Sequence, residues 1–357
     1  MNVRDNSNFL YQLVTTPSPS GYEAFALDVF EREIKTYYSG ETVRDKFGNT
    51  YFKAGHGDIK VLLSGHIDEV CATVTYISDD GMLSIAQAGG IDKKDLVASN
   101  VLLLKDDLNT VEGIVIKMPI HLEYGEEKLD EATKFDEMRV DVGCETKEEV
   151  EKLGIHPGTP VLYDRQTNLN FGENRMHCTG LDDKIGVFVA EEIFRYIVNP
   201  EHLPRDWEYK YTVYCLAATQ EEVGCRSVCV ASRKINPDIS IDFDVTFATD
   251  GDLGINKNKY CDVKLGKGVV ISYGAEKSLR LNTVLKEASS SYRYQEVAGG
   301  RAGGTNTDNI QKFAEDCETT LLSIPNRSMH TRVEVCDWRD VQSAVDMVSR
   351  AIILKML

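Results

Sequence analysis

The sequence TQEEVG at residues 219–224 places two glutamates, Glu221 and Glu222, side by side after an apolar run. The preceding residues, YKYTVYCLAA, have the composition of a buried strand. Two like charges at the end of a buried strand are costly unless a cation neutralises them. The pair therefore suggests a cation site at this point of the chain.

Other histidines and acids follow apolar runs or open a helix in the same way. Five segments carry such side chains, in chain order His66 with Asp68, Asp182 with Asp183, Glu221 with Glu222, Asp244, and His330. In an open α/β sheet, ligands bind at the edge where the carboxyl ends of the strands meet. Each residue alone has an ordinary explanation, such as a loop histidine or an aspartate that caps a helix. Their coincidence at one predicted edge favours a shared site.

The residue types at this edge indicate metal chemistry. Imidazole and carboxylate ligands without cysteine are typical of catalytic zinc, cobalt or manganese sites with open coordination positions. A balance of charges indicates two ions. The charge of two divalent cations is offset by one bridging carboxylate, one terminal carboxylate on each ion and one hydroxide. We therefore expect two divalent metal ions.

The two neighbouring glutamates can have different roles. Successive side chains on an extended chain point in opposite directions, so one carboxylate could bind a metal ion while the other faces the substrate. Water on a divalent ion has a pKa of about 7 instead of 15.7, but its proton still needs a base that is not itself a ligand. Asp68 follows His66 by two residues and could hydrogen-bond its imidazole.

The elements that must position these residues alternate between strand and helix. Apolar runs in IKVLLSGHIDEV, YKYTVYCLAA, PDISIDFDVTF and ETTLLSIPNRSMHT predict strands. The stretch LDDKIGVFVAEEIFRYIV predicts an amphipathic helix, because apolar residues recur every four positions at Ile185, Val189, Ile193 and Ile197. This alternation predicts an α/β fold, with an open, mostly parallel sheet and helices on both faces.

Residues 71–165 depart from that alternation. Short β-like runs separated by turn residues predict a small all-β unit there. We expect this unit to be an insert in an α/β domain that comprises residues 1–70 and 166–357. Near the N-terminus, Ser20 and Glu23 have capping-box spacing, which predicts the start of a helix.

Composition excludes several classes of protein. A length of 357 residues exceeds the usual size of one core, and a net charge of −17 argues against nucleic-acid binding. The sequence has no 18-residue apolar run and no apolar signal-peptide core, so we expect a cytoplasmic protein without a membrane partner. The nine cysteines include no CxxC pair, and we expect free thiols.

Six motifs together carry a family resemblance, in chain order SGHIDEV, GLDDKIG, TQEEVG, DFDVTFATD, GGTNTD and IPNRSMHT. The chain resembles, over nearly its whole length, the dinuclear aminopeptidases of the glutamyl-aminopeptidase and tetrahedral-aminopeptidase type, metallopeptidase family forty-two. The resemblance implies a phosphorylase/hydrolase-like mixed α/β sheet with an inserted β-barrel. It also implies that the barrel mediates dimerisation and that the dimers often build hollow dodecamers.

The resemblance further implies two ions per subunit, zinc or cobalt, and five metal ligands, His66, Asp182, Glu222, Asp244 and His330. Asp182 would bridge the ions, His66 and Asp244 would hold one of them, and the remaining two ligands would hold the other. Glu221 would be the general base, and Asp68 would orient the imidazole of His66.

We therefore expect a cytosolic aminopeptidase that removes N-terminal residues from peptides. The residues by themselves leave three alternatives open. One is a related dinuclear hydrolase, such as a carboxypeptidase or an N-acyl deacylase. Another is a glycosidase that uses Glu221 and Glu222 as its pair of acids. The third is a non-enzymatic scaffold that metal ions stabilise.

Overall fold

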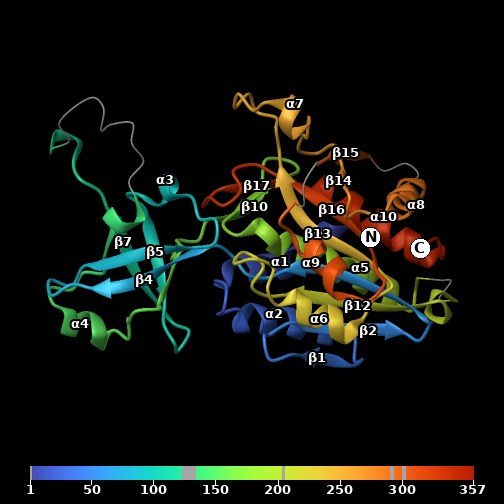
Figure 1. The fold of residues 1–357 in the computed structure, drawn as a ribbon, viewed down its shortest axis with the longest axis horizontal. Helices are drawn as coiled ribbons and strands as arrows, with labels where there is room; N and C mark the ends of the chain where they lie inside the picture. The colour runs from blue at the N-terminus through green and yellow to red at the C-terminus, as the bar shows by residue number, and fades with distance from the viewer. Residues whose placement is uncertain (1, 123–133, 203–205, 290–292, 300–302) are drawn as a thin grey trace. The chain divides into compact units, whose positions relative to one another are not determined.

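Two units, each with its own buried core, make up the chain in the computed structural model, which describes residues 2–122, 134–202, 206–289, 293–299 and 303–357 (Figure 1). The first, here called the α/β unit, comprises Met1–Asp68, Thr167–Met329 and Val333–Leu357. The second, here called the barrel unit, comprises Glu69–Gln166 and His330–Arg332. The predicted fold class, α/β with an inserted β-barrel, is confirmed.

The α/β unit is built on an eight-stranded mixed sheet with the strand order β1-β2-β12-β3-β13-β16-β14-β15. The neighbouring strands β12, β3, β13 and β16 are parallel, whereas β2 pairs antiparallel with β1 and β12, and β14 pairs antiparallel with β16. The strands span Thr42–Arg44 (β1), Thr50–Gly55 (β2), Ile59–His66 (β3), Tyr211–Ala218 (β12), Ile239–Phe247 (β13), Val269–Tyr273 (β14), Tyr294–Ala298 (β15) and Glu318–Asn326 (β16).

Helices cover both faces of this sheet (Figure 1). On β3, Val61 and Leu63 belong to the core with α1, α2, α5, α8 and α10, whereas Leu62 packs on the opposite face with α6 and α9. Because both faces are buried, the strand is apolar at successive positions. The helices span Ser7–Thr15 (α1), Ala24–Lys35 (α2), Leu181–Val198 (α5), Val228–Ile235 (α6), Lys257–Tyr260 (α7), Leu279–Ser289 (α8), Asn306–Phe313 (α9) and Trp338–Ile353 (α10).

A small three-stranded sheet completes the α/β unit. Its strand order is β10-β11-β17, with bounds Thr167–Phe171, Arg175–Cys178 and Glu334–Asp337. Both pairings are antiparallel. Among the helices of the described residues, none combines the length and the apolar composition that a membrane crossing requires.

The barrel unit is a closed six-stranded barrel with the strand order β4-β5-β8-β7-β6-β9. Inward residues such as Val74, Ile85, Val101 and Val115 fill its core. Closure leaves the barrel without free sheet edges. Its elements span Cys71–Ile77 (β4), Leu83–Ala88 (β5), Lys93–Leu96 (α3), Asn100–Leu104 (β6), Thr110–Ile116 (β7), Arg139–Asp141 (β8), Lys147–Lys152 (α4) and Pro160–Tyr163 (β9).

The helix α2 begins without the predicted capping box. Its N-cap residue is Glu23, whose side chain makes no capping hydrogen bond. Ser20 Oγ instead donates to Asp68 Oδ2 over 2.6 Å, and Glu23 Oε1 accepts from the N–H groups of Gly21 and Gln220. The capping-box prediction is wrong because partners outside the helix occupy both side chains.

Candidate metal centre and active site

The ends of parallel strands bring several predicted residues together. His66 is the last residue of β3 and pairs with Ala218, the last residue of β12. The strand β13 lies on the other side of β3 and carries Asp244 near the same edge. The first turn of α5 supplies Asp182. Local sequence decides where each strand ends, and the parallel register then gathers the ends at one place.

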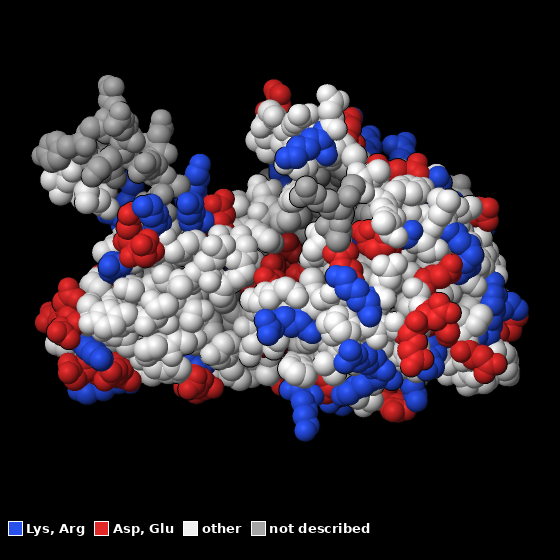
Figure 2. All heavy atoms as spheres, in the orientation of Figure 1, with Lys and Arg blue, Asp and Glu red and all other residues white. Residues whose placement is uncertain are grey.

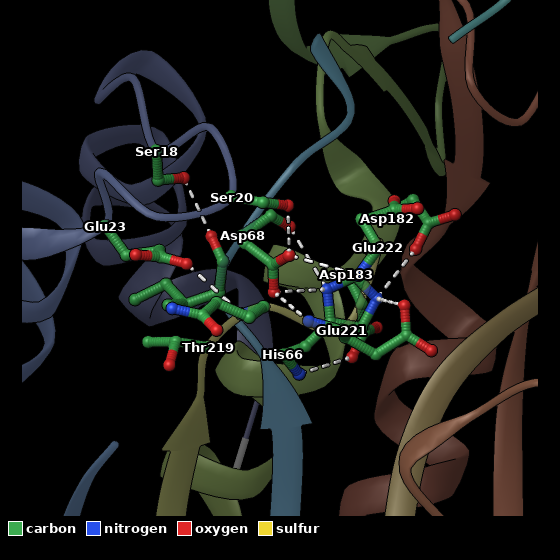
Figure 3. Close-up of polar contacts among 12 residues, drawn as sticks. Ser18, Ser20, Glu23, His66, Asp68, Asp182, Asp183, Thr219, Glu221 and Glu222 are labelled. Atoms are coloured by element: carbon green, nitrogen blue, oxygen red, sulfur yellow. Dashed lines mark hydrogen bonds and ion pairs between the residues drawn. The ribbon is translucent and has the colours of Figure 1, made fainter. Parts of the chain in front are cut away.

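The imidazole of His66 is buried, and its two nitrogens have different neighbours (Figure 3). Nδ1 lies 3.1 Å from the carbonyl oxygen of Asp68 and 3.5 Å from its Oδ1. Nε2 lies 3.2 Å from Asp182 Oδ1, 3.7 Å from Glu221 Oε2 and 4.0 Å from Asp244 Oδ1. An Nδ1–H donated to Asp68 leaves the lone pair of Nε2 available to a metal ion.

Glu221 and Glu222 lie in a turn and not on an extended chain. The strand β12 ends at Ala218, and Gln220 has a φ of 58°. The N–H of Gly224 donates to the carbonyl oxygen of Glu221 over 2.8 Å, which closes the turn. The premise of an extended, alternating pair is therefore wrong, because the left-handed backbone of Gln220 ends the strand conformation before the glutamates.

The two glutamates nevertheless belong to different groups of ligand atoms. Glu221 groups with His66 and Asp244, and Glu222 groups with His66 and Asp182. Within each group, the ligand atoms lie within 4.8 Å of one another. Ligands at about 2.1 Å from a tetrahedral ion lie roughly 3.4 Å apart, so modest side-chain movement would bring either group to metal-binding distances.

The charges of these side chains are unbalanced within the protein. Burial raises the pKa of Asp244 well above its ordinary value, with His66 opposing and Asp182 adding to the shift. Burial also raises the pKa of Glu221 to about 7, with His66 opposing and Glu222 adding. Burial alone would lower the pKa of His66, but the surrounding carboxylates raise it well above its ordinary value. One imidazolium cannot offset four carboxylates, so the donor set fits divalent cations.

Asp68 also holds the glutamate turn, a role that the sequence did not indicate. Its Oδ1 accepts from the N–H of Glu221 over 2.9 Å, and its Oδ2 accepts from the N–H of Glu222 over 3.1 Å. The same fully buried carboxylate therefore contacts His66 and both glutamate amides. Backbone partners this far along the chain leave no sequence pattern from which they could have been predicted.

Two further buried aspartates accept hydrogen bonds from backbone groups at or near the site. Asp183 Oδ2 accepts from the N–H of His66 over 3.1 Å, and its Oδ1 accepts from the N–H of Gly186 over 3.0 Å. Asp242 Oδ2 accepts from the N–H and the hydroxyl of Thr307, each over 3.0 Å. The sequence signal for Asp242 is its position inside an apolar strand, where a carboxylate needs partners.

Cys225 and Glu334 are neighbours of the site that the sequence reasoning missed. Cys225 Sγ lies 3.2 Å from Glu221 Oε1 and 3.3 Å from the carbonyl oxygen of Gly304. Glu334 Oε2 accepts from the N–H of Asp182 over 3.0 Å. The contact of Cys225 restrains Glu221, and the contact of Glu334 restrains Asp182.

His330 belongs to the barrel unit. Its Nδ1 lies 3.0 Å from the carbonyl oxygen of Gly90, and its own carbonyl oxygen accepts from the N–H of Asp92 over 3.3 Å. His330 is a member of neither ligand group found among the described residues. Its role as a metal ligand stays a prediction.

A match to a family model and a relative that is 30% identical place this chain in one family. Residues 48–347 match the family described as M42 glutamyl aminopeptidase. The lysyl aminopeptidase of Pyrococcus furiosus is 30% identical over 341 residues, which cover 94% of this chain and 93% of that protein. The TET aminopeptidase of a marine sediment thaumarchaeon is 25% identical, covers 99% of this chain and 97% of its own, and superposes with a TM-score of 0.88.

A further solved structure adds an assembly to the comparison. The TET1 peptidase of Pyrococcus horikoshii is 25% identical, with a TM-score of 0.81 over 96% of this chain and 98% of its own. That peptidase can assemble into a tetrahedron or a large octahedral shell.

Proposed function

Because this chain belongs to the M42 family of aminopeptidases, which are metal-dependent peptidases, we propose that it uses two divalent metal ions and a glutamate base to release N-terminal residues from peptides. Family membership favours an aminopeptidase over the carboxypeptidase, deacylase, glycosidase and scaffold alternatives. The observation that carries the metal-centre proposal is the gathering of His66, Asp182, Glu222 and Asp244, with Glu221 beside them, in two overlapping groups of ligand atoms. The number of ions rests on the balance between the charges of the carboxylates and those of divalent cations.

The proposed ions are zinc or cobalt, which imidazole and carboxylate ligands suit. His66 and Asp244 would hold one ion, Glu222 and His330 would hold the other, and Asp182 would bind both. When bound, the ions would polarise the scissile carbonyl and lower the pKa of water. Asp68 would keep the proton of His66 on Nδ1, and the 3.1 Å contact of that nitrogen supports this role.

Glu221 is the proposed general base. It would accept a proton from the attacking water and pass it to the leaving amine. Two observations support this role. Burial raises the pKa of Glu221 to about 7, where a carboxyl group exchanges protons near neutral pH. Cys225 Sγ also contacts Glu221 Oε1, which restrains the carboxyl group.

A matched pair of variants tests the two glutamates. We expect Glu221→Gln to keep its metal and to lose turnover by roughly 10²–10⁴-fold, because only the proton acceptor is removed. We expect Glu222→Gln to lower the metal content as well. Elemental analysis after dialysis gives the metal content, and hydrolysis of aminoacyl p-nitroanilides gives the turnover.

Either of two results would contradict this assignment. A fully active Glu221→Gln enzyme would remove the general base. Metal loss in Glu221→Gln, together with metal retention in Glu222→Gln, would exchange the roles of the two residues.

The division of labour proposed for the two units is catalysis in the α/β unit and self-association through the barrel unit. The strand β7 exposes Ile114 and Ile116 at 53% and 45% of their surface, and Met118 follows at 59%. Figure 2 shows a broad uncharged area on the barrel unit, with charged side chains at its margin. Neighbouring exposed apolar side chains such as Ile114, Ile116 and Met118 are typical of interfaces, and they support a dimer as the first step of assembly.

We also propose a cytoplasmic location. All nine cysteines are free thiols, as expected of a protein kept in a reducing compartment. Cell fractionation tests the proposal, and recovery of the enzyme from a secreted fraction would contradict it.

A further inference from the structure

A tight turn near the N-terminus presents two side chains to the site. The N–H of Tyr22 donates to the carbonyl oxygen of Pro19 over 2.8 Å, which closes a turn over residues 19–22. Gly21 has a φ of 93°, a conformation that glycine adopts without steric cost at the third position of such a turn. The turn orients Ser20 and leads directly to Glu23, the residue before α2.

Side chains of residues 18–23 contact the ends of two strands (Figure 3). Ser18 Oγ donates to the carbonyl oxygen of Ile67 over 2.7 Å. Ser20 Oγ donates to Asp68 Oδ2 over 2.6 Å. Glu23 Oε1 accepts from the N–H of Gln220 over 3.1 Å. These partners lie just beyond β3 and β12, where the site residues are.

The partners of Ser20 and Glu23 are in contact with, or adjacent to, the proposed base Glu221. The N–H groups of three consecutive residues are bound by two carboxylates, that of Gln220 by Glu23 and those of Glu221 and Glu222 by Asp68. Gln220 has a left-handed backbone that residues other than glycine seldom adopt, so it needs such restraints. Ser20 in turn restrains the Asp68 carboxylate.

Neither side chain is used for the helix that it precedes. The spacing of Ser20 and Glu23 is that of a capping box, in which the serine oxygen would accept from the first turn of α2. The Ser20 hydroxyl instead donates its proton to Asp68, and the side chain of Glu23 makes no capping hydrogen bond. A capping-box sequence that does not cap its helix is expected where the side chains serve a functional site instead.

We propose that Ser20 and Glu23 are positioning residues for the peptidase reaction. They hold the backbone of residues 220–222, Ser20 through Asp68 and Glu23 directly, so that the Glu221 carboxyl group stays beside His66. The inference rests on the proposed role of Glu221 as general base. A misplacement of about 1 Å in such a group can cost roughly 100-fold in rate.

Paired substitutions distinguish the loss of a hydrogen bond from the loss of a side chain. Ser20→Ala and Glu23→Ala remove the contacts, whereas Ser20→Thr keeps a hydroxyl and Glu23→Gln keeps an acceptor oxygen. We expect each alanine variant to lower kcat by about 10- to 100-fold at saturating metal, with KM and metal content unchanged. The conservative variants should stay within about threefold of the parent enzyme.

Ser99→Ala is the matched control, because Ser99 is buried and its Oγ donates over the same 2.6 Å to a backbone carbonyl oxygen, that of Leu96 in the barrel unit. We expect it to lower the melting temperature and to leave kcat within twofold. If Ser20→Ala fails to fold, Glu23→Ala tests the restraint on residues 220–222 through the N–H of Gln220.

A double-mutant cycle distinguishes positioning from a general structural role. If Ser20 acts through Glu221, then Ser20→Ala should have little further effect on the residual turnover of Glu221→Gln. Equal losses in both backgrounds would overturn the inference, and so would a Ser20→Ala enzyme within twofold of the parent while Glu221→Gln is inactive. A fully active Glu221→Gln enzyme would instead overturn the proposed function.

Discussion

At the scale of single residues, the site is defined by buried acids and by the few groups that restrain them. Cys225 is one of these groups, since its Sγ lies 3.2 Å from Glu221 Oε1. Burial and the neighbouring Glu221 carboxylate raise the pKa of Cys225 well above its ordinary value. The thiol therefore keeps its proton and can donate it to the carboxylate, in place of acting as a nucleophile.

We predict that Cys225→Ala lowers kcat by roughly 10- to 100-fold, because a hydrogen bond stabilises a charged group by about 1.5–3 kcal/mol. Cys225→Ser keeps a donor and should recover most of the rate. Cys229→Ala is the control, since Cys229 lies four residues further along in α6 and its Sγ contacts the carbonyl oxygen of Cys225. Steady-state kinetics on one aminoacyl substrate measure all three, and equal rates for Cys225→Ala and the parent would contradict the role.

At the scale of elements, the helix α5 carries a site residue in its first turn and two buried glutamates further along. The site residue is the proposed metal ligand Asp182, and the glutamates are Glu191 and Glu192, both without exposed surface. Glu191 Oε1 lies 2.8 Å from an Arg195 nitrogen, and Glu192 Oε1 accepts from Asn6 Nδ2 over 2.7 Å. Arg195 also contacts Glu33. Because Arg195 Nε also lies 3.6 Å from Glu192 Oε1, three carboxylates share one guanidinium. Burial raises the pKa of Glu192 from its ordinary 4.5 to about 7.

This pair makes stability depend on pH. A carboxyl group with a raised pKa in the folded state contributes stability that is fully present below pH 4.5 and is lost as the pH rises through about 7. We predict that Glu192→Gln raises the free energy of unfolding at pH 8 by about 3 kcal/mol and flattens its fall between pH 5 and pH 8. Denaturant titrations at four pH values measure this.

The control for that prediction is Glu148→Gln on the exposed face of α4, which should leave the pH dependence unchanged. A Glu192→Gln protein whose stability falls with pH as steeply as that of the parent would show that the buried pair is not responsible.

At the scale of the whole molecule, the proposed metal binding and self-association would both add to stability. The buried carboxylates of the site repel one another, and a ligand that binds only the folded state stabilises it by mass action. At a metal concentration of 100 times Kd the gain is about 2.7 kcal/mol. For a unit of this size that corresponds to a rise in melting temperature of roughly 5 °C.

We therefore predict that chelation by EDTA lowers the melting temperature by about 5 °C or more, and that zinc or cobalt restores it. The shift should be larger at pH 8 than at pH 6, because burial raises the pKa of the proposed ligand Asp244 and protons then compete with metal at the lower pH. Differential scanning calorimetry measures the shift. A melting temperature that EDTA does not change would contradict a metal centre in the folded protein.

The exposed apolar residues of β7 give a separate prediction about assembly. Replacing Ile114 and Ile116 with glutamate should break the self-associated enzyme into smaller species, because charge is costly in a buried interface. Light scattering after size exclusion measures the mass, with the parent expected well above the 39.9 kDa of one chain. A double variant with the mass of the parent would place the interface elsewhere.

Much of the fold and part of the site could be predicted from the sequence. The apolar run of β3 and the four-residue period of α5 are local signals, and the structure has a strand and a helix at those places. His66, Glu221 and Asp244 come near one another for a general reason, since parallel strands meet at one edge. Residue type then indicated metal chemistry.

The sequence by itself therefore determined the alternation of strands and helices, the all-β character of the insert and the chemical character of the site, because periodicity and residue type are properties of short segments. Only the tertiary structure decided that Ser20 and Glu23 serve Asp68 and Gln220 and do not cap a helix. Those partners lie 48 and 197 residues away, and a hydrogen bond across such a distance leaves no pattern in the chain. The turn that contains Glu221 and Glu222 could not be predicted for the same reason. Gln220 precedes it with a left-handed backbone, and the contact that holds Gln220 comes from a distant segment of the chain.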